Sequence, residues 1–158
     1  MEQMIIQLIC ATLGTFAFSM VFHLRKEFLG WAALGGFLSW AVYLLMLHGA
    51  EKNTFISCLV SAVCVAFYGE IMARKLHGPA TVFIIPGVLP LIPGSGLFYT
   101  MSYAVSADWD LAQHYGFITI QFALGIAIGI SLVMGIFSMA RNVSDNHKAM
   151  MRKRQKTE

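Results

Sequence analysis

The chain has 158 residues, of which 58% are hydrophobic and 12% are charged, and its formal net charge is +3. Since a typical soluble domain is about 25% charged, this composition excludes a soluble protein and leaves no room for a separate soluble domain. We therefore predict an all-α integral membrane protein. The three cysteines lie inside apolar runs without metal-ligand spacing, and the histidines fall mostly at the ends of such runs, so no metal or other cofactor is predicted.

The apolar residues fall into five stretches separated by short polar loops. A helix needs about 20 mostly apolar residues to cross a bilayer, and each stretch is long enough. We expect one transmembrane domain over residues 1–141, followed by a basic cytoplasmic tail over residues 142–158. The predicted spans are 4–22, 28–47, 54–73, 79–104 and 115–140.

The basic residues indicate an orientation. If the spans alternate, the first loop, the loop after the third span and the tail lie on one side, and every lysine and arginine except Lys52 falls there. Cytoplasmic loops carry the excess of these residues, so we predict an external N-terminus and a cytoplasmic C-terminus. We interpret the tail as a solvated, partly disordered topology anchor rather than as a segment that binds nucleic acid or anionic lipid.

The fourth stretch is unusual because it contains every proline of the chain. An interior proline removes a helical N–H and frees the carbonyl four residues earlier, which predicts free carbonyls on Val82, Pro86 and Leu89. An unpaired backbone group in hydrocarbon costs several kcal/mol, so broken backbone needs a protein cover or a wet cavity. A re-entrant hairpin would disturb the charge sorting, so we predict a broken span. Its prolines are Pro79, Pro86, Pro90 and Pro93.

The predicted break offers a binding site. Residues 93–96, Pro-Gly-Ser-Gly, would begin a second half-helix whose free N–H groups and positive dipole end suit a carboxylate. Ser95 adds a hydroxyl, and the freed carbonyls could face a cation or an ammonium group. Secondary transporters bind substrates at unwound helices of this kind. The alternative is a kink that neighbouring helices satisfy without any ligand.

Glu70 is the one acid that falls deep within a predicted span, and an intramembrane acid is a functional hypothesis by default. Arg74 lies one turn later, so the alternative is an interfacial ion pair. In the fifth span, Gly125, Gly129 and Gly135 form small-xxx-small patterns that let two helix backbones approach. These glycines are candidates for contact with a second copy or a partner subunit.

An enzyme is not predicted. Neither paired intramembrane aspartates nor a phosphate-binding glycine loop occurs in the sequence. The Gly-Ser-Gly at 94–96 is only faintly similar to the serine motif of rhomboid proteases, because Pro93 replaces a required glycine and no later span contains a histidine.

Several motifs resemble the small subunit of the bacterial threonine/serine exporter family. They are Gly-Glu-Ile-Met-Ala-Arg at 69–74, Pro-Ala-Thr at 79–81, two Pro-Gly steps around Pro-Leu at 86–94, and Tyr-Thr-Met at 99–101. The resemblance implies a multi-pass exporter of the bacterial inner membrane, driven by an ion gradient, with a larger membrane subunit as partner. Some two-subunit members are associated with export of dicarboxylates such as succinate.

We therefore expect a subunit that exports threonine, serine or a similar small carboxylate metabolite. Five short spans cannot easily enclose a path, so a larger subunit or a second copy should supply the other wall. The alternatives are a dicarboxylate exporter subunit and a non-transporting scaffold. The predicted substrate and translocation residues are Glu70, Arg74, Thr81, Pro86, Gly87, Pro90, Pro93, Gly94, Ser95, Gly96 and Tyr99.

Overall fold

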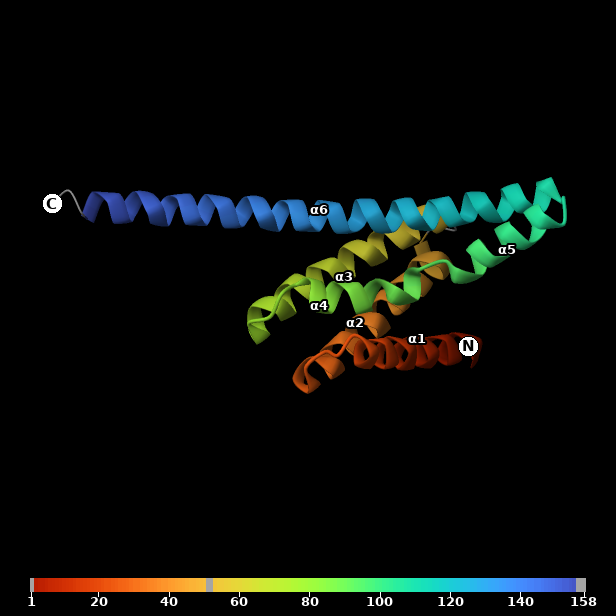
Figure 1. The fold of residues 1–158 in the computed structure, drawn as a ribbon, viewed down its shortest axis with the longest axis horizontal. Coiled ribbons are helices and arrows are strands. Elements are labelled where there is room, and N and C mark those ends of the chain that lie inside the picture. Colours follow the sequence, from red (N-terminus) through yellow and green to blue (C-terminus); the bar gives the residue numbers. More distant parts are fainter. Residues whose placement is uncertain (1, 51–52, 156–158) are drawn as a thin grey trace.

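The structure is a computed structural model that describes residues 2–50 and 53–155 (Figure 1). These residues form helices and no strand, which confirms the predicted all-α fold. The elements are α1 (Glu2–Val21), α2 (Lys26–Leu45), the π-helical turn η1 (Met46–Ala50), α3 (Thr54–Leu76), α4 (Thr81–Val88), the 3₁₀ turn η2 (Leu89–Leu91), α5 (Gly94–Val105) and α6 (Trp109–Gln155).

Among the described residues, four helical segments are long and apolar enough to cross a membrane. They are α1, Lys26–Gly49, α3 and Trp109–Ala140. The pair Thr81–Leu91 and Gly94–Val105 passes the same test together, with a bend of 49° between its halves. Counted as one span, this pair brings the crossings to five, as predicted from the sequence.

The last helix differs from its predicted bounds at both ends. It begins at Trp109, before the expected start at residue 115, because the Asp108 carboxylate accepts a hydrogen bond from the Leu111 N–H at 3.3 Å and caps the first turn. At the other end α6 continues to Gln155, where a partly disordered tail had been expected. Residues 156–158 of that tail lie outside the described part of the chain.

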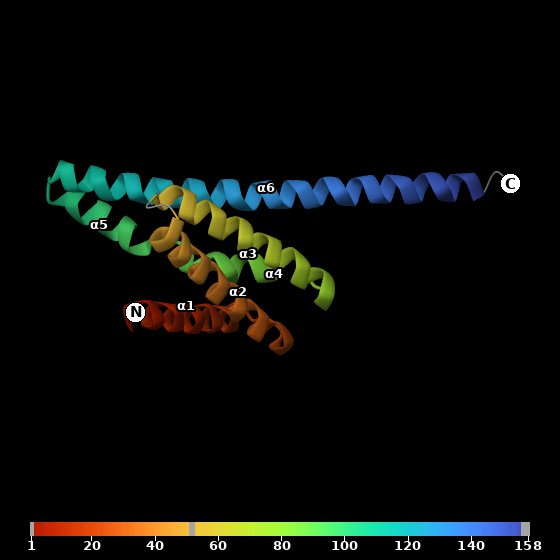
Figure 2. The same cartoon turned by 180° about the vertical axis from the view of Figure 1, so that it is seen from behind.

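Successive spans run in opposite directions. The turns at 22–25 and 77–80 lie at the same end of the bundle as the C-terminal half of α6, and the N-terminal end of α1 lies at the opposite end with the α5–α6 turn (Figures 1 and 2). This arrangement places the basic segments together, as the charge sorting predicted. That this end faces the cytoplasm stays a prediction.

Small residues bring α2, α3 and α4 into close contact. A Cβ built on Gly87 would lie 2.6 Å from a methyl of Val65 and 3.7 Å from the Gly35 Cα, and one built on Gly69 would lie 2.5 Å from Ile84. The Ser61 hydroxyl donates a hydrogen bond to the Ser39 carbonyl between α3 and α2. Close backbone approach of this kind is how membrane helices pack, since burial from lipid supplies no hydrophobic drive.

The glycines of α6 pack within the chain. A Cβ on Gly125 would lie 3.2 Å from Cys58, and one on Gly129 would lie 2.8 Å from the Ala62 Cβ. Both glycines are buried against α3, which is the close helix packing that their spacing predicts, and this contact lies within the chain rather than with another subunit. Gly135, by contrast, has nothing within 4 Å of an added Cβ and remains available for such a contact.

Candidate functional site

The fourth span stays helical past its first two interior prolines. The Pro86 carbonyl accepts a hydrogen bond from the Leu89 N–H, and the Leu89 carbonyl accepts one from the Ile92 N–H at 3.2 Å. Tightening into the 3₁₀ turn η2 therefore satisfies two of the three carbonyls that were expected to be free. These two carbonyls are therefore not left unpaired, contrary to the prediction from the sequence.

The chain breaks at Ile92 and Pro93. Ile92 is extended, with φ −66° and ψ 122°, and Pro93 has φ −79° and ψ 65°. The Gly94 N–H then donates to the Ile92 carbonyl at 2.8 Å, which forms an inverse γ-turn around Pro93. This turn produces the bend, and α5 starts directly after it.

The start of α5 presents unpaired donors, as the sequence predicted for a half-helix. The Leu97 N–H bonds the Pro93 carbonyl at 3.0 Å, but the described residues supply no backbone acceptor for the N–H groups of Ser95 and Gly96. No side chain caps this end. The first N–H groups of a helix form an anion-binding site because they point outward with the positive end of the helix dipole.

A cavity of ≈ 220 Å³ lies beside this helix start. It collects residues from α2, from the break, from α5 and from α6. Five of them had been predicted as site residues: Pro90, Pro93, Ser95, Gly96 and Tyr99. The others are Trp40, Leu91, Ile92, Tyr115, Ile118 and Phe122.

Sequence reasoning missed the α2 and α6 walls of this cavity. Tyr115, Ile118 and Phe122 recur at the spacing of one helix face, and this was the available signal. That spacing indicates a cavity wall only once the α5–α6 hairpin is known to turn this face of α6 toward the break. No local sequence pattern specifies that turn.

The cavity walls are aromatic and uncharged. The Tyr99 and Tyr115 ring centres are 5.1 Å apart, and Tyr103 stacks on Tyr115 at 5.6 Å. On the α2 side, the Trp40 ring lies 5.1 Å from that of Tyr43. The Trp40 indole nitrogen is buried and finds no acceptor among the described residues. An unpaired buried donor costs about 1–3 kcal/mol.

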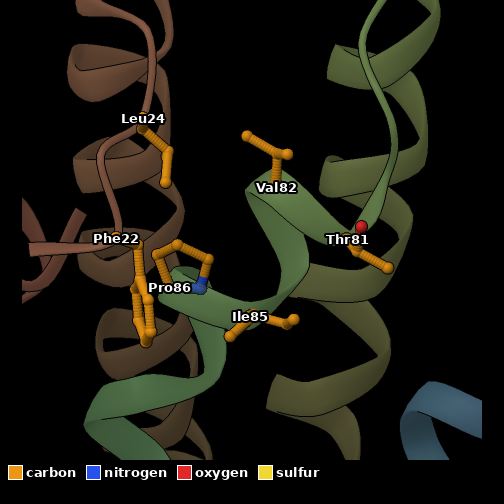
Figure 3. A pocket seen from close by; sticks show the side chains of 6 residues that line it. All are labelled: Phe22, Leu24, Thr81, Val82, Ile85 and Pro86. Carbon is orange, nitrogen blue, oxygen red and sulfur yellow. The ribbon is translucent and has the colours of Figure 1, made fainter.

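Thr81 and Pro86 line a different cavity, of ≈ 190 Å³, between the α1–α2 turn and α4. Figure 3 shows the Pro86 ring beside the side chain of Phe22. The remaining lining residues, Leu24, Val82 and Ile85, are aliphatic. Gly87 lies in the helix packing described above. These three predicted site residues are therefore separate from the cavity at the break.

Glu70 and Arg74 lie toward the other end of the bundle. Glu70 is 1% exposed, and the exposed Arg74 places its guanidinium 4.8 Å from the Phe137 ring centre. Phe137 and Tyr115 belong to the same continuous helix, and at a rise of about 1.5 Å per residue they are roughly 33 Å apart along its axis. The structure therefore does not bring Glu70 and Arg74 to the cavity at the break.

Membrane-length helices, together with a bent helix pair whose second helix begins beside a cavity, define a multi-pass membrane protein. The sequence model of the threonine/serine exporter family, ThrE, matches residues 7–136. The chain therefore belongs to the threonine/serine exporter family, which confirms the resemblance found in its motifs. No solved structure matches the chain.

Proposed function

We propose that this chain is a subunit of a secondary exporter that moves threonine, serine or a similar small carboxylate metabolite out of the bacterial cytoplasm. The observation that carries the proposal is the pair of unpaired N–H groups at Ser95 and Gly96, on the wall of the cavity at the break. A carboxylate bound there would satisfy donors that the fold leaves open. Family membership supports this substrate class, and the cavity is the proposed substrate site.

A partner wall follows from the exposure of α5. This helix packs mainly against α6, and Leu97, Phe98 and Met101 on its other side are 48%, 67% and 66% exposed. The cavity lies close to this uncovered helix, so we propose that a larger membrane subunit or a second copy covers it. Gly135 on the outer face of α6 is a further contact candidate. We propose that the complex lies in the inner membrane with the basic end inside.

Glu70 is the proposed proton carrier. Glu70 is buried in a helix that is long and apolar enough to cross a membrane, and an acidic side chain at such a position marks a candidate proton relay. Its position near the basic end of the bundle would make it a coupling group remote from substrate, rather than a substrate ligand. The positive charge of Arg74, one helical turn away on α3, would act on the Glu70 carboxylate at the basic end of the bundle.

Export of labelled threonine from cells loaded with a threonine dipeptide tests the proposal. Cells that express the wild-type chain with its membrane partner should export threonine faster than cells without the chain. Glu70→Gln keeps the size of the side chain and removes its charge, and it should reduce export toward the background rate at a normal protein level.

Glu27→Gln is the matched control, because the Glu27 side chain in the first turn of α2 is 72% exposed, and its export should equal that of wild type. Equal export by the Glu70 and Glu27 variants would contradict the proton-carrier role. No acceleration of threonine or serine export by the wild-type chain would contradict the proposed function itself.

A further inference from the structure

We infer that the break in the fourth span recognises the zwitterion of an α-amino acid, with Tyr99 and Tyr115 beside its ammonium group, and that it therefore rejects dicarboxylates. The inference rests on the proposed function of the cavity as the substrate site, and it names the feature of the substrate that the cavity reads. Neither Tyr115 nor the ammonium contact follows from family membership alone.

The cavity is lined by uncharged residues. None of its lining residues is an aspartate, glutamate, lysine, arginine or histidine. A helix N-terminus offers roughly half a positive charge, which suits one carboxylate. A second carboxylate would be desolvated without a partner, because Arg74 lies against Phe137, about six helical turns along α6 from Tyr115.

The two half-helices present ends of opposite polarity at the break. Carbonyls at the end of a helix point along its axis beyond the last turn. The described residues supply no backbone donor for the carbonyls of Pro90 and Leu91, and both residues line the cavity. Carbonyl acceptors thus end η2 where the N–H donors of α5 begin. A molecule with one anionic and one cationic group matches this pair of ends.

Two tyrosine rings form an aromatic wall of the cavity. Tyr99 on α5 and Tyr115 on α6 face each other at 5.1 Å between ring centres, and both line the cavity together with Ser95 and Gly96. The face of a tyrosine ring attracts a cation that lies within about 6 Å of the ring centre. Since Tyr103 stacks on Tyr115 with an angle of 15° between the rings, the position of the Tyr115 ring is fixed before any ligand binds.

Uptake of labelled threonine into inside-out membrane vesicles tests this recognition, because competitors then reach the cytoplasmic face directly. The competitors are serine, succinate and 2,3-dihydroxybutyrate, which is threonine with its ammonium group replaced by hydroxyl. Serine should compete well. Succinate and the ammonium-free analogue should each require concentrations at least about tenfold higher, the factor that corresponds to losing one contact of 1.4 kcal/mol.

The variants assign the ammonium contact to Tyr115. Tyr115→Leu should raise the half-inhibitory concentration of serine by about five- to thirtyfold, within the range of a desolvated cation–π contact, and leave that of the ammonium-free analogue unchanged. Tyr115→Phe keeps the ring and should weaken serine less than Tyr115→Leu does. Phe117→Leu is the matched control on the same helix, since Phe117 is 63% exposed and does not line the cavity.

Two results would overturn the inference while the proposed function stands. One is succinate competing as well as serine; the other is Tyr115→Leu weakening serine and the ammonium-free analogue equally, which would make the ring a packing element. If Tyr115→Leu fails to accumulate, Tyr99→Leu is subject to the same comparison. Wild-type vesicles that transport neither threonine nor serine would contradict the proposed function, and the inference would fail with it.

Discussion

Replacing Gly129 by leucine is expected to prevent stable assembly of the helix bundle. A Cβ at this position would lie 2.8 Å from the Ala62 Cβ, 3.0 Å from the Leu59 carbonyl oxygen and 3.2 Å from the Val63 nitrogen. Two of these atoms belong to the backbone of α3, so a rotamer change cannot relieve the contact. Overpacking a tight interior costs about 1–3 kcal/mol or more, a large fraction of the roughly 5–15 kcal/mol that stabilises a typical protein.

Gly135→Leu is the matched control, because the same change occurs on the same helix where an added Cβ meets nothing within 4 Å. There leucine should be neutral or favourable, since its helix propensity exceeds that of glycine by up to about 1 kcal/mol. The measurement is the fraction of protein that stays monodisperse after heating in mild detergent. Equal melting temperatures for the two variants would show that α3 and α6 do not pack as described.

The crossings and the broken span could be predicted from the sequence because both follow from local chemistry. Span length and the sorting of basic residues fix the number of crossings, and the prolines require a break somewhere between Pro86 and Gly96. The sequence did not locate the break at Ile92 and Pro93. A 3₁₀ turn absorbs the effect of Pro90 and Pro93 on two carbonyls, and this depends on small adjustments of backbone angles.

The cavity could be predicted only in part, because four of its eleven lining residues come from elements remote in sequence. Ser95 and Gly96 followed from the expected helix start, whereas Trp40 and Tyr115 required knowledge of which helix faces the break. The glycines of α6 show the same limit. A small-xxx-small pattern predicts that something approaches closely, but only the fold identifies α3 as that neighbour.

Replacing Gly96 by valine is expected to reduce export by at least about tenfold while Gly94→Val leaves it near wild type. A Cβ on Gly96 would lie 2.5 Å from the Thr119 hydroxyl oxygen, whereas one on Gly94 meets nothing within 4 Å. The larger side chain would push α5 away from α6 and cover the N–H groups proposed to hold the carboxylate. Losing a charged hydrogen bond of about 1.5–3 kcal/mol corresponds to a fall of tenfold or more. Export of labelled threonine at matched membrane levels measures the effect.

A second substitution separates displacement of α5 from simple misfolding. The Thr119 hydroxyl donates to the Tyr115 carbonyl at 2.8 Å, so it is fixed in the position that a side chain at residue 96 would meet. Gly96→Ala should therefore impair export less than valine does, and adding Thr119→Ala should restore it, because removal of the hydroxyl leaves the Thr119 Cβ at an ordinary 3.7 Å from the new methyl. Contacting residues show such non-additivity. If Thr119→Ala only adds its own defect to that of Gly96→Ala, the contact between α5 and α6 does not control the site, and the N–H groups of α5 lose their proposed role.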